Sequence, residues 1–130
     1  MTIQVLLADD HGLYAETLAL LLSTDERIVV VGHAEDGCQA VEQALRLRPD
    51  VVLMDVNMPH VDGIEASRRL HRELPSVRIV MLTSSAAAED VERACAAGAS
   101  AYLTKDADGD AIADEVVRVS ALEAGTRRAA

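Results

Sequence analysis

The most informative stretch of the chain is Val51-Val52-Leu53-Met54-Asp55-Val56-Asn57-Met58-Pro59. Its four leading apolar residues, two of them β-branched, predict a short strand that is buried on both faces. Pro59 has no N–H to donate and favours an extended or turn conformation at Met58, so the strand should end just after Asp55. Open α/β sheets bind ligands at the carboxyl ends of their strands. Taken alone, an aspartate at the end of a strand more commonly begins a turn. Whether Asp55 instead belongs to a ligand site depends on the residues elsewhere in the chain.

Strand-like and helix-like segments alternate on both sides of this stretch. Apolar β-rich runs predict strands at 3–8, 28–33, 51–55, 78–82 and 101–103. Helical spacing of apolar residues predicts helices from 11 to 23, 36 to 48, 62 to 74, 86 to 97 and 108 to 123. Strict alternation with short links implies right-handed crossovers and a parallel sheet covered on both sides. The expected fold is therefore a doubly wound (βα)5 α/β domain with three layers.

Composition narrows the class of function. The 130 residues suffice for one domain with its own core. Half of them are hydrophobic but none is Trp or Phe, so the core must be aliphatic. The net charge of −10, from 22 acidic and 12 basic side chains, opposes close approach to nucleic acid or anionic lipid. This domain alone is a poor candidate for gripping DNA.

The cysteines, the opening residues and the apolar runs all bear on the expected location of the protein. Cys38 and Cys95 lie in helix-like segments without C-x-x-C spacing, so neither a disulfide nor a zinc site is expected. The sequence begins with neither a basic signal region nor a long apolar run, and no segment approaches the roughly 18 apolar residues of a membrane span. We expect a soluble cytoplasmic protein with no membrane partner.

Polar residues follow four of the five predicted strands. Because parallel strands end at one edge of the sheet, that edge should collect Asp9, Asp10, Asp55, Thr83, Ser84 and Lys105. Three adjacent carboxylates repel one another unless a cation neutralises them. Oxygen ligands with room for water and phosphate suit Mg²⁺, and the lysine and a hydroxyl could then donate to a phosphoryl group on Asp55. Helix N-capping is the alternative explanation for the Asp9-Asp10 pair.

The same residues carry a family resemblance. The set comprises Asp9-Asp10, the M-D-V-N-M-P run around Asp55, Asp62-Gly63, Thr83-Ser84, Gly98-Ala99, and Tyr102 three residues before Lys105. Together these resemble the receiver domain of two-component response regulators over about residues 2 to 122. Asp-Asp-His at 9–11 and the Lys105-Asp106 pair resemble receivers that precede LuxR/NarL-type helix-turn-helix domains. The resemblance implies a flavodoxin-like sheet with strand order 2-1-3-4-5.

The resemblance also implies a role for each site residue. Asp55 would accept a phosphoryl group from a sensor histidine kinase, with Mg²⁺ held by Asp10, Asp55 and the backbone carbonyl of Asn57. Asp9 would act on the ion through water. Lys105 would bind a phosphoryl oxygen, and Thr83 would move its hydroxyl onto the phosphate. Such a domain is not an enzyme beyond phosphorylating itself from a phosphodonor and slowly losing the group again.

Other residues would set the lifetime of the phosphate and its output. Asn57, Ser84 and Ser85 would modulate attack by water. Movement of Thr83 would make room for the Tyr102 ring to turn inward, which would repack the face made by the fourth helix, fifth strand and fifth helix. An ordinary packed strand aromatic is the alternative reading of Tyr102.

The ends of the chain and its partners complete the expectations. We expect a receiver at 1–124 and the start of a linker or a disordered tail at 125–130. The chain is either a piece of a transcription regulator or a complete single-domain regulator, and DNA would be bound only through an output domain outside it. The first or fifth helix could form a homodimer.

Two rival functions stay open. A Mg²⁺-dependent phosphohydrolase with an aspartate nucleophile would also place carboxylates, Lys and Thr at a strand edge. It would normally carry its nucleophile after the first strand, with a second Asp two residues on and a cap domain. A phosphorylation-independent module of receiver shape would more often have lost Asp10, Asp55 or Lys105, all of which are present.

Overall fold

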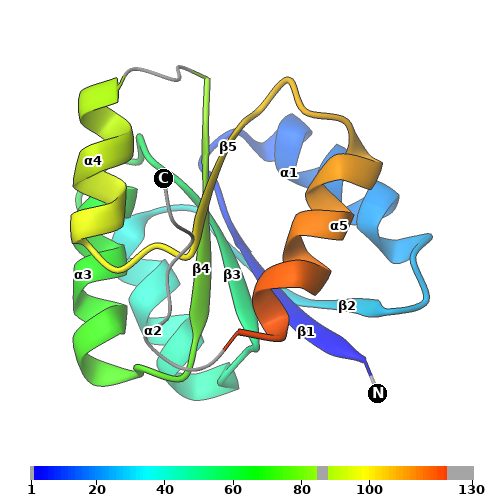
Figure 1. The fold of residues 1–130 in the computed structure, drawn as a ribbon, viewed down its shortest axis with the longest axis horizontal. Helices are drawn as coiled ribbons and strands as arrows, with labels where there is room; N and C mark the ends of the chain where they lie inside the picture. The colour runs from blue at the N-terminus through cyan, green and yellow to red at the C-terminus, as the bar shows by residue number, and fades with distance from the viewer. Residues whose placement is uncertain (1, 85–87, 123–130) are drawn as a thin grey trace.

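Strands and helices alternate strictly along the chain in the computed structural model (Figure 1), which describes residues 2–84 and 88–122, with the backbone alone for 88–90. The elements are β1 (Ile3–Ala8), α1 (Gly12–Ser23), β2 (Ile28–Ala34), α2 (Gly37–Leu47), β3 (Val51–Asp55), α3 (Gly63–Glu73), β4 (Arg78–Thr83), α4 (Ala88–Ala96), β5 (Ala101–Thr104) and α5 (Gly109–Ser120). The predicted strands differ from these by no more than one residue at any end.

The five strands form one parallel sheet in the order β2-β1-β3-β4-β5. The predicted α/β fold and strand order are therefore confirmed. β3 lies at the centre of the sheet and all five of its residues are buried. In the register of the sheet, Asp55 lies beside Leu82 of β4, and Thr83 lies beside Thr104 of β5. The carboxyl ends of these strands thus meet at one edge.

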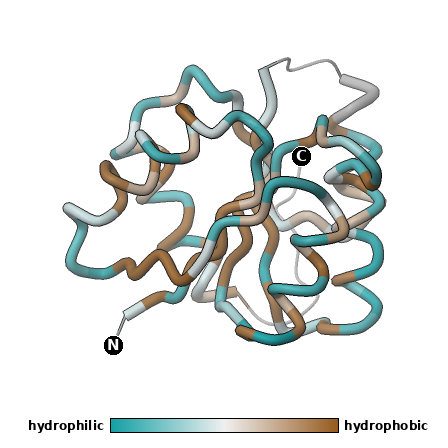
Figure 2. Tube along the Cα trace, turned by 180° about the vertical axis from the view of Figure 1, so that it is seen from behind, coloured by the Kyte–Doolittle hydropathy of each residue, from teal (hydrophilic) through white to brown (hydrophobic). Residues whose placement is uncertain are grey.

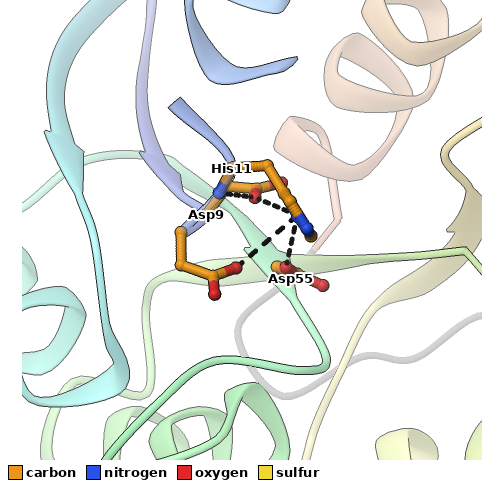
Figure 3. Close-up of side chains that lie close together, drawn as sticks. Asp9, His11 and Asp55 are labelled. Atoms are coloured by element: carbon orange, nitrogen blue, oxygen red, sulfur yellow. Dashed lines mark hydrogen bonds and ion pairs between the residues drawn. The ribbon is translucent and has the colours of Figure 1, made fainter. Parts of the chain in front are cut away.

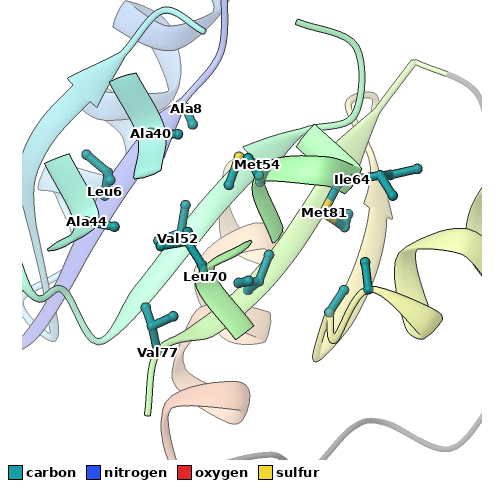
Figure 4. Packing of buried hydrophobic residues seen from close by; sticks show 14 of the residues in the cluster. Leu6, Ala8, Ala40, Ala44, Val52, Met54, Ile64, Leu70, Val77 and Met81 are labelled. Carbon is teal, nitrogen blue, oxygen red and sulfur yellow. The ribbon is translucent and has the colours of Figure 1, made fainter. Parts of the chain in front are cut away.

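Helices cover both faces of the sheet, with α2, α3 and α4 on one side and α1 and α5 on the other (Figure 1). We call these the α2–α4 face and the α1/α5 face. Alternate residues of each strand point to opposite faces, so Leu53 packs against α1 and α5 while Met54 packs against α2 and α3. Figure 4 shows Met54 with its neighbours on the α2–α4 face. Hydrophobic segments follow the strands, and the outward turns of the helices are hydrophilic (Figure 2).

Three helices begin with the same device. The side chains of Asp36, Asp62 and Asp108 accept hydrogen bonds of 2.8 Å from the backbone N–H groups three residues later. Each N-cap satisfies one N–H that the helix itself leaves without a partner. These acidic residues mark the predicted helix starts at 36, 62 and 108 correctly.

The predicted end of α5 at 123 is wrong, because the helix ends at Ser120. Val119 is the last buried residue of its apolar stripe, and a short helix is stable mainly where it buries such a stripe. The predicted start of α4 at 86 falls outside the described residues. Along the described chain, no helix has both the length and the apolar character that crossing a membrane requires.

Candidate functional site

The strand ends bring two buried carboxylates and an ammonium together. Asp9 follows β1, Asp55 ends β3, and Lys105 follows β5. The strand alternation points all three side chains toward the α1/α5 face. Asp9 is only 4% exposed and Asp55 only 2%. Charges buried to this extent are costly unless they are paired or bound to an ion.

Lys105 is the cation that links the two carboxylates. Its Nζ lies 2.7 Å from Asp9 Oδ2 and 3.2 Å from Asp55 Oδ2. The other carboxylate oxygens bind backbone: Asp55 Oδ1 accepts from the N–H of Asn57 at 3.2 Å, and Asp9 Oδ1 accepts from that of His11 at 2.8 Å. Both carboxylates are thereby held with one oxygen turned toward the lysine.

Burial raises the pKa of Asp55 above its ordinary value of 3.8, and the neighbouring charge of Asp9 raises it further. Lys105 opposes both effects but does not cancel them. The folded protein therefore places more negative charge at this edge than its own cation neutralises. Such a group attracts a proton or a metal ion.

His11 lies over these carboxylates (Figure 3). Its Nδ1 is 3.3 Å from Asp9 Oδ1, 3.6 Å from Asp10 Oδ1 and 3.9 Å from Asp55 Oδ2. The structure also makes His11, not an aspartate, the N-cap of α1, so helix capping does not explain the Asp9-Asp10 pair.

Four residues could hold a metal ion together. Asp9, Asp10, His11 and Asp55 each offer one ligand atom, and these atoms all lie within 4.8 Å of one another. Asp9 Oδ2 is buried and accepts no hydrogen bond from the described part of the chain, although it lies 2.7 Å from Lys105 Nζ. Mg²⁺ prefers oxygen ligands, carboxylates among them. The residues present fit that ion.

Thr83 and Tyr102 occupy the opposite side of the sheet. Thr83 ends β4 and is 1% exposed. Tyr102 of β5 is half-buried and packs against the hydrophobic cluster of the α2–α4 face. Because Thr83 pairs with Thr104 and Tyr102 lies two residues earlier on β5, the two side chains are diagonal neighbours on one face.

The remaining predicted residues lie around this edge. Ser84 and Asn57 are exposed, and Ser85 lies outside the described residues. The structure therefore brings together Asp9, Asp10, Asp55 and Lys105, and places Thr83 at the same edge on the other face. The catalytic and modulating roles assigned to these residues stay predictions.

Tyr14 is a neighbour of the site that the sequence patterns did not indicate. The ring centroid of Tyr14 lies 4.8 Å from Lys105 Nζ. Its position four residues after Asp10, in the first turn of α1, was the available signal, because that turn begins at the charged edge.

Comparison with known proteins agrees with this geometry. Residues 5–117 match the family model described as the response regulator receiver domain. The response regulator protein VraR of Staphylococcus aureus is 39% identical over 120 residues, which cover 92% of this chain and 57% of VraR. The chain thus spans little more than half the length of this relative.

Solved structures give the same result. The signal receiver domain of NarL from Mycobacterium tuberculosis superposes with a TM-score of 0.89 at 29% identity, covering 92% of this chain and 96% of that one. A LuxR-family two-component response regulator from Aurantimonas sp. SI85-9A1 gives 0.88 at 30% identity, covering 93% and 86%. With its strand order, its acidic edge and these matches, the chain belongs to the response regulator receiver domain family.

Proposed function

We propose that this receiver accepts a phosphoryl group on Asp55 from the phosphohistidine of a sensor histidine kinase, in the cytoplasm. The observation that supports it most directly is the Asp55 carboxylate, 2% exposed and 3.2 Å from Lys105 Nζ. A buried nucleophile beside a fixed cation suits phosphoryl transfer, in which positioning and charge neutralisation supply most of the catalysis.

In the proposed reaction an Asp55 oxygen attacks phosphorus, the new O–P bond forms and the N–P bond to the kinase histidine breaks. The imidazole leaves with its electron pair and takes up a proton from solvent. Lys105 stays beside Asp55 Oδ2 and donates to a phosphoryl oxygen. The N–H of Asn57 keeps the second carboxylate oxygen in place.

Asp10, Asp55 and the backbone carbonyl of Asn57 would hold Mg²⁺, with Asp9 contacting it through water. When bound, this ion neutralises charge on the carboxylates and the incoming phosphate. The spare lone pair on Asp9 Oδ2 and the crowding of three carboxylates support this assignment. Asn57, Ser84 and Ser85 would tune the later attack of water, so that self-dephosphorylation is slow.

The output is proposed to run from Thr83 to Tyr102. Phosphorylation adds about −1.5 to −2 charges and three acceptor oxygens, which would attract the Thr83 hydroxyl. Tyr102 is the diagonal neighbour of Thr83 on the α2–α4 face, so a movement of one side chain changes the space open to the other. The α4–β5–α5 surface would then shift between two pre-existing arrangements.

The phosphorylated form is proposed to act through an output domain outside this chain. The net charge of −10 does not favour DNA binding by the receiver itself, and VraR is much longer than this chain. We propose a receiver at 1–124 with a linker beginning at 125–130, and a homodimer through α1. Leu13, Leu20 and Leu21 of α1 are 80%, 71% and 49% exposed, which supports that surface.

Intact mass spectrometry after incubation with acetyl phosphate tests the central proposal. Wild-type protein should gain one phosphoryl group with Mg²⁺ and none after chelation, and Asp55→Asn should gain none. Asp50→Asn, an exposed aspartate just before β3, is the matched control and should label like the wild type.

Other outcomes point to the rival functions. An unlabelled wild type, under conditions that label a known receiver, would favour a phosphorylation-independent module. Rapid multiple-turnover release of inorganic phosphate would favour a phosphohydrolase.

A further inference from the structure

Tyr14 is a half-buried aromatic residue that the proposed reaction does not use. It lies in the first turn of α1, and Lys105 Nζ stands 4.8 Å from the centre of its ring. A cation within about 6 Å of an aromatic ring face is attracted by the ring quadrupole. The contact joins the first helix to the loop after the last strand.

The hydroxyl group of Tyr14 does not explain why a tyrosine stands there. It is buried and has no hydrogen-bond partner within the described ranges 2–84 and 88–122. Together with Asp9, Leu18 and Leu53 it lines a cavity of only about 10 Å³. The ring is therefore the part of this side chain with an identifiable contact at the site.

The phenol also stays neutral at this position. Burial raises the pKa of Tyr14 to about 12, with further contributions from the charges of Asp9 and Asp55. A neutral ring beside Lys105 offers its negative face to the ammonium without adding a third anion to the carboxylates. The ring can thus attract Lys105 without competing for the place of a phosphate.

Lys105 has a long, flexible side chain, and its ammonium group is shared between two carboxylates. A further contact that restrains it would therefore matter for its position beside Asp55. Its Nζ is nearer to Asp9 Oδ2, at 2.7 Å, than to Asp55 Oδ2, at 3.2 Å. The side chain is only 13% exposed, and the ring of Tyr14 is one of the groups that keep the ammonium at the edge of the sheet. Without the ring, the flexible four-carbon stem would gain access to solvent.

From this geometry we infer that Tyr14 is a positioning residue: its ring holds the Lys105 ammonium beside Asp55, where the phosphoryl group arrives. This inference rests on the proposed phosphoacceptor function and adds a residue to it. The ring acts through Lys105 and does not touch the reacting atoms.

The contact itself is tested without phosphate or metal. Proton NMR of the metal-free protein should show the Lys105 side-chain methylenes shifted upfield by the ring current of Tyr14. Tyr14→Phe should keep this shift and Tyr14→Leu should lose it. An unshifted Lys105 in the folded wild type would overturn the inference.

The consequence is tested by the affinity for beryllofluoride, a mimic of the phosphoryl group on aspartate, with Mg²⁺ present. Tyr14→Leu should weaken binding by about three- to tenfold. Tyr14→Phe, which keeps the ring, should bind within about twofold of the wild type. In a Lys105→Met background, Tyr14→Leu should cause almost no further loss. Tyr14→Met is the second variant should the leucine protein not fold.

The outcomes separate this inference from the proposed function. An equal loss from Tyr14→Leu with and without Lys105 would show a structural role only and overturn the inference. Normal binding by Tyr14→Leu would overturn it as well, while leaving the phosphoacceptor function intact. A wild type that binds no beryllofluoride and takes up no phosphoryl group would overturn the function, and the inference with it.

Discussion

The two faces of the sheet carry different parts of the site, although the same strands build both. Asp9, Asp55 and Lys105 point to the α1/α5 face, where Tyr14 packs beneath the lysine. Thr83 and Tyr102 point to the α2–α4 face. In the proposed function, the phosphoryl group is bound on the α1/α5 face and the α2–α4 face responds to it.

The separation depends on the two-residue repeat of a strand. Met81 and Leu82 are adjacent in β4, yet they belong to hydrophobic clusters on opposite faces of the sheet. A phosphoryl group at the edge can be reached from both sides, whereas the cores beneath it are separated by the sheet. A group bound at this edge can therefore contact side chains of both faces. Four predictions test this comparison of the faces.

The largest expected effect comes from removing the Thr83 hydroxyl, which is proposed to couple Asp55 to Tyr102. Thr83→Ala should still bind beryllofluoride on Asp55 but should abolish the accompanying change in the Tyr102 ring signals. The reason is that no hydroxyl remains to move toward the phosphoryl mimic. NMR of the only two tyrosines, Tyr14 and Tyr102, measures this directly.

Ser84→Ala is the matched control, because Ser84 is the exposed neighbour of Thr83. It should keep the Tyr102 response. A full response in Thr83→Ala would disprove the coupling between the faces through this residue.

The next largest effect concerns the close approach of α3 to the site. A Cβ on Gly63 would lie 1.9 Å from the backbone carbonyl oxygen of Asp55. Gly63→Ala should therefore lower the free energy of unfolding by about 3 kcal/mol or more, because α3 and β3 must move apart. Urea denaturation monitored by circular dichroism gives the value.

Gly12→Ala in α1 provides the comparison on the other face. Apart from its chain neighbours and the backbone of its own helix, no described atom lies within 4 Å of a Cβ placed on Gly12. We expect a stabilisation of about 0.5–1 kcal/mol, since alanine favours the helix. Similar losses in both variants would contradict the steric explanation.

A smaller effect is expected from the charge of Asp55. Because its pKa is raised above 3.8 in the folded state, the folded protein binds more protons than the unfolded chain between 3.8 and the raised value. Stability then falls as pH rises through that window. Metal-free Asp55→Asn should be more stable than the wild type by about 1 kcal/mol at pH 7.

Thermal unfolding at several pH values tests this prediction. The advantage of Asp55→Asn should shrink as the pH falls toward 3.8, and Mg²⁺ should reduce it at pH 7. The exposed control Glu42→Gln should change stability by less than about 0.5 kcal/mol. A less stable Asp55→Asn at pH 7 would mean that the ionised carboxylate stabilises the fold.

The smallest effect concerns the ends of one helix on each face. Arg48 ends α2 in the left-handed region, with φ 49°, whereas Thr24 ends α1 in the right-handed region. Arg48→Gly should stabilise the protein by about 0.5–1 kcal/mol, and Thr24→Gly should destabilise it by a similar amount. If urea denaturation shows that both substitutions change the free energy of unfolding in the same direction, this backbone explanation is refuted.

The order of the elements, the parallel sheet and most residues of the site edge could be predicted from the sequence. Strands are short apolar runs, and Asp36, Asp62 and Asp108 cap their helices locally, so these signals lie within a few residues. The collection of Asp9, Asp55 and Lys105 follows from parallel strands alone. The end of α5 was misplaced because it depends on where burial stops, which neighbouring residues do not reveal.

The contacts among the side chains of the site, in contrast, are visible only once the chain is folded. Lys105 lies 94 residues from His11 in the chain, yet their nitrogens are 3.2 Å apart. Tyr14 looked like any apolar residue of an amphipathic helix until α1 was placed over the edge of the sheet. Such contacts depend on how whole elements pack against one another, and the local sequence pattern does not set the distance between elements that are far apart in the chain.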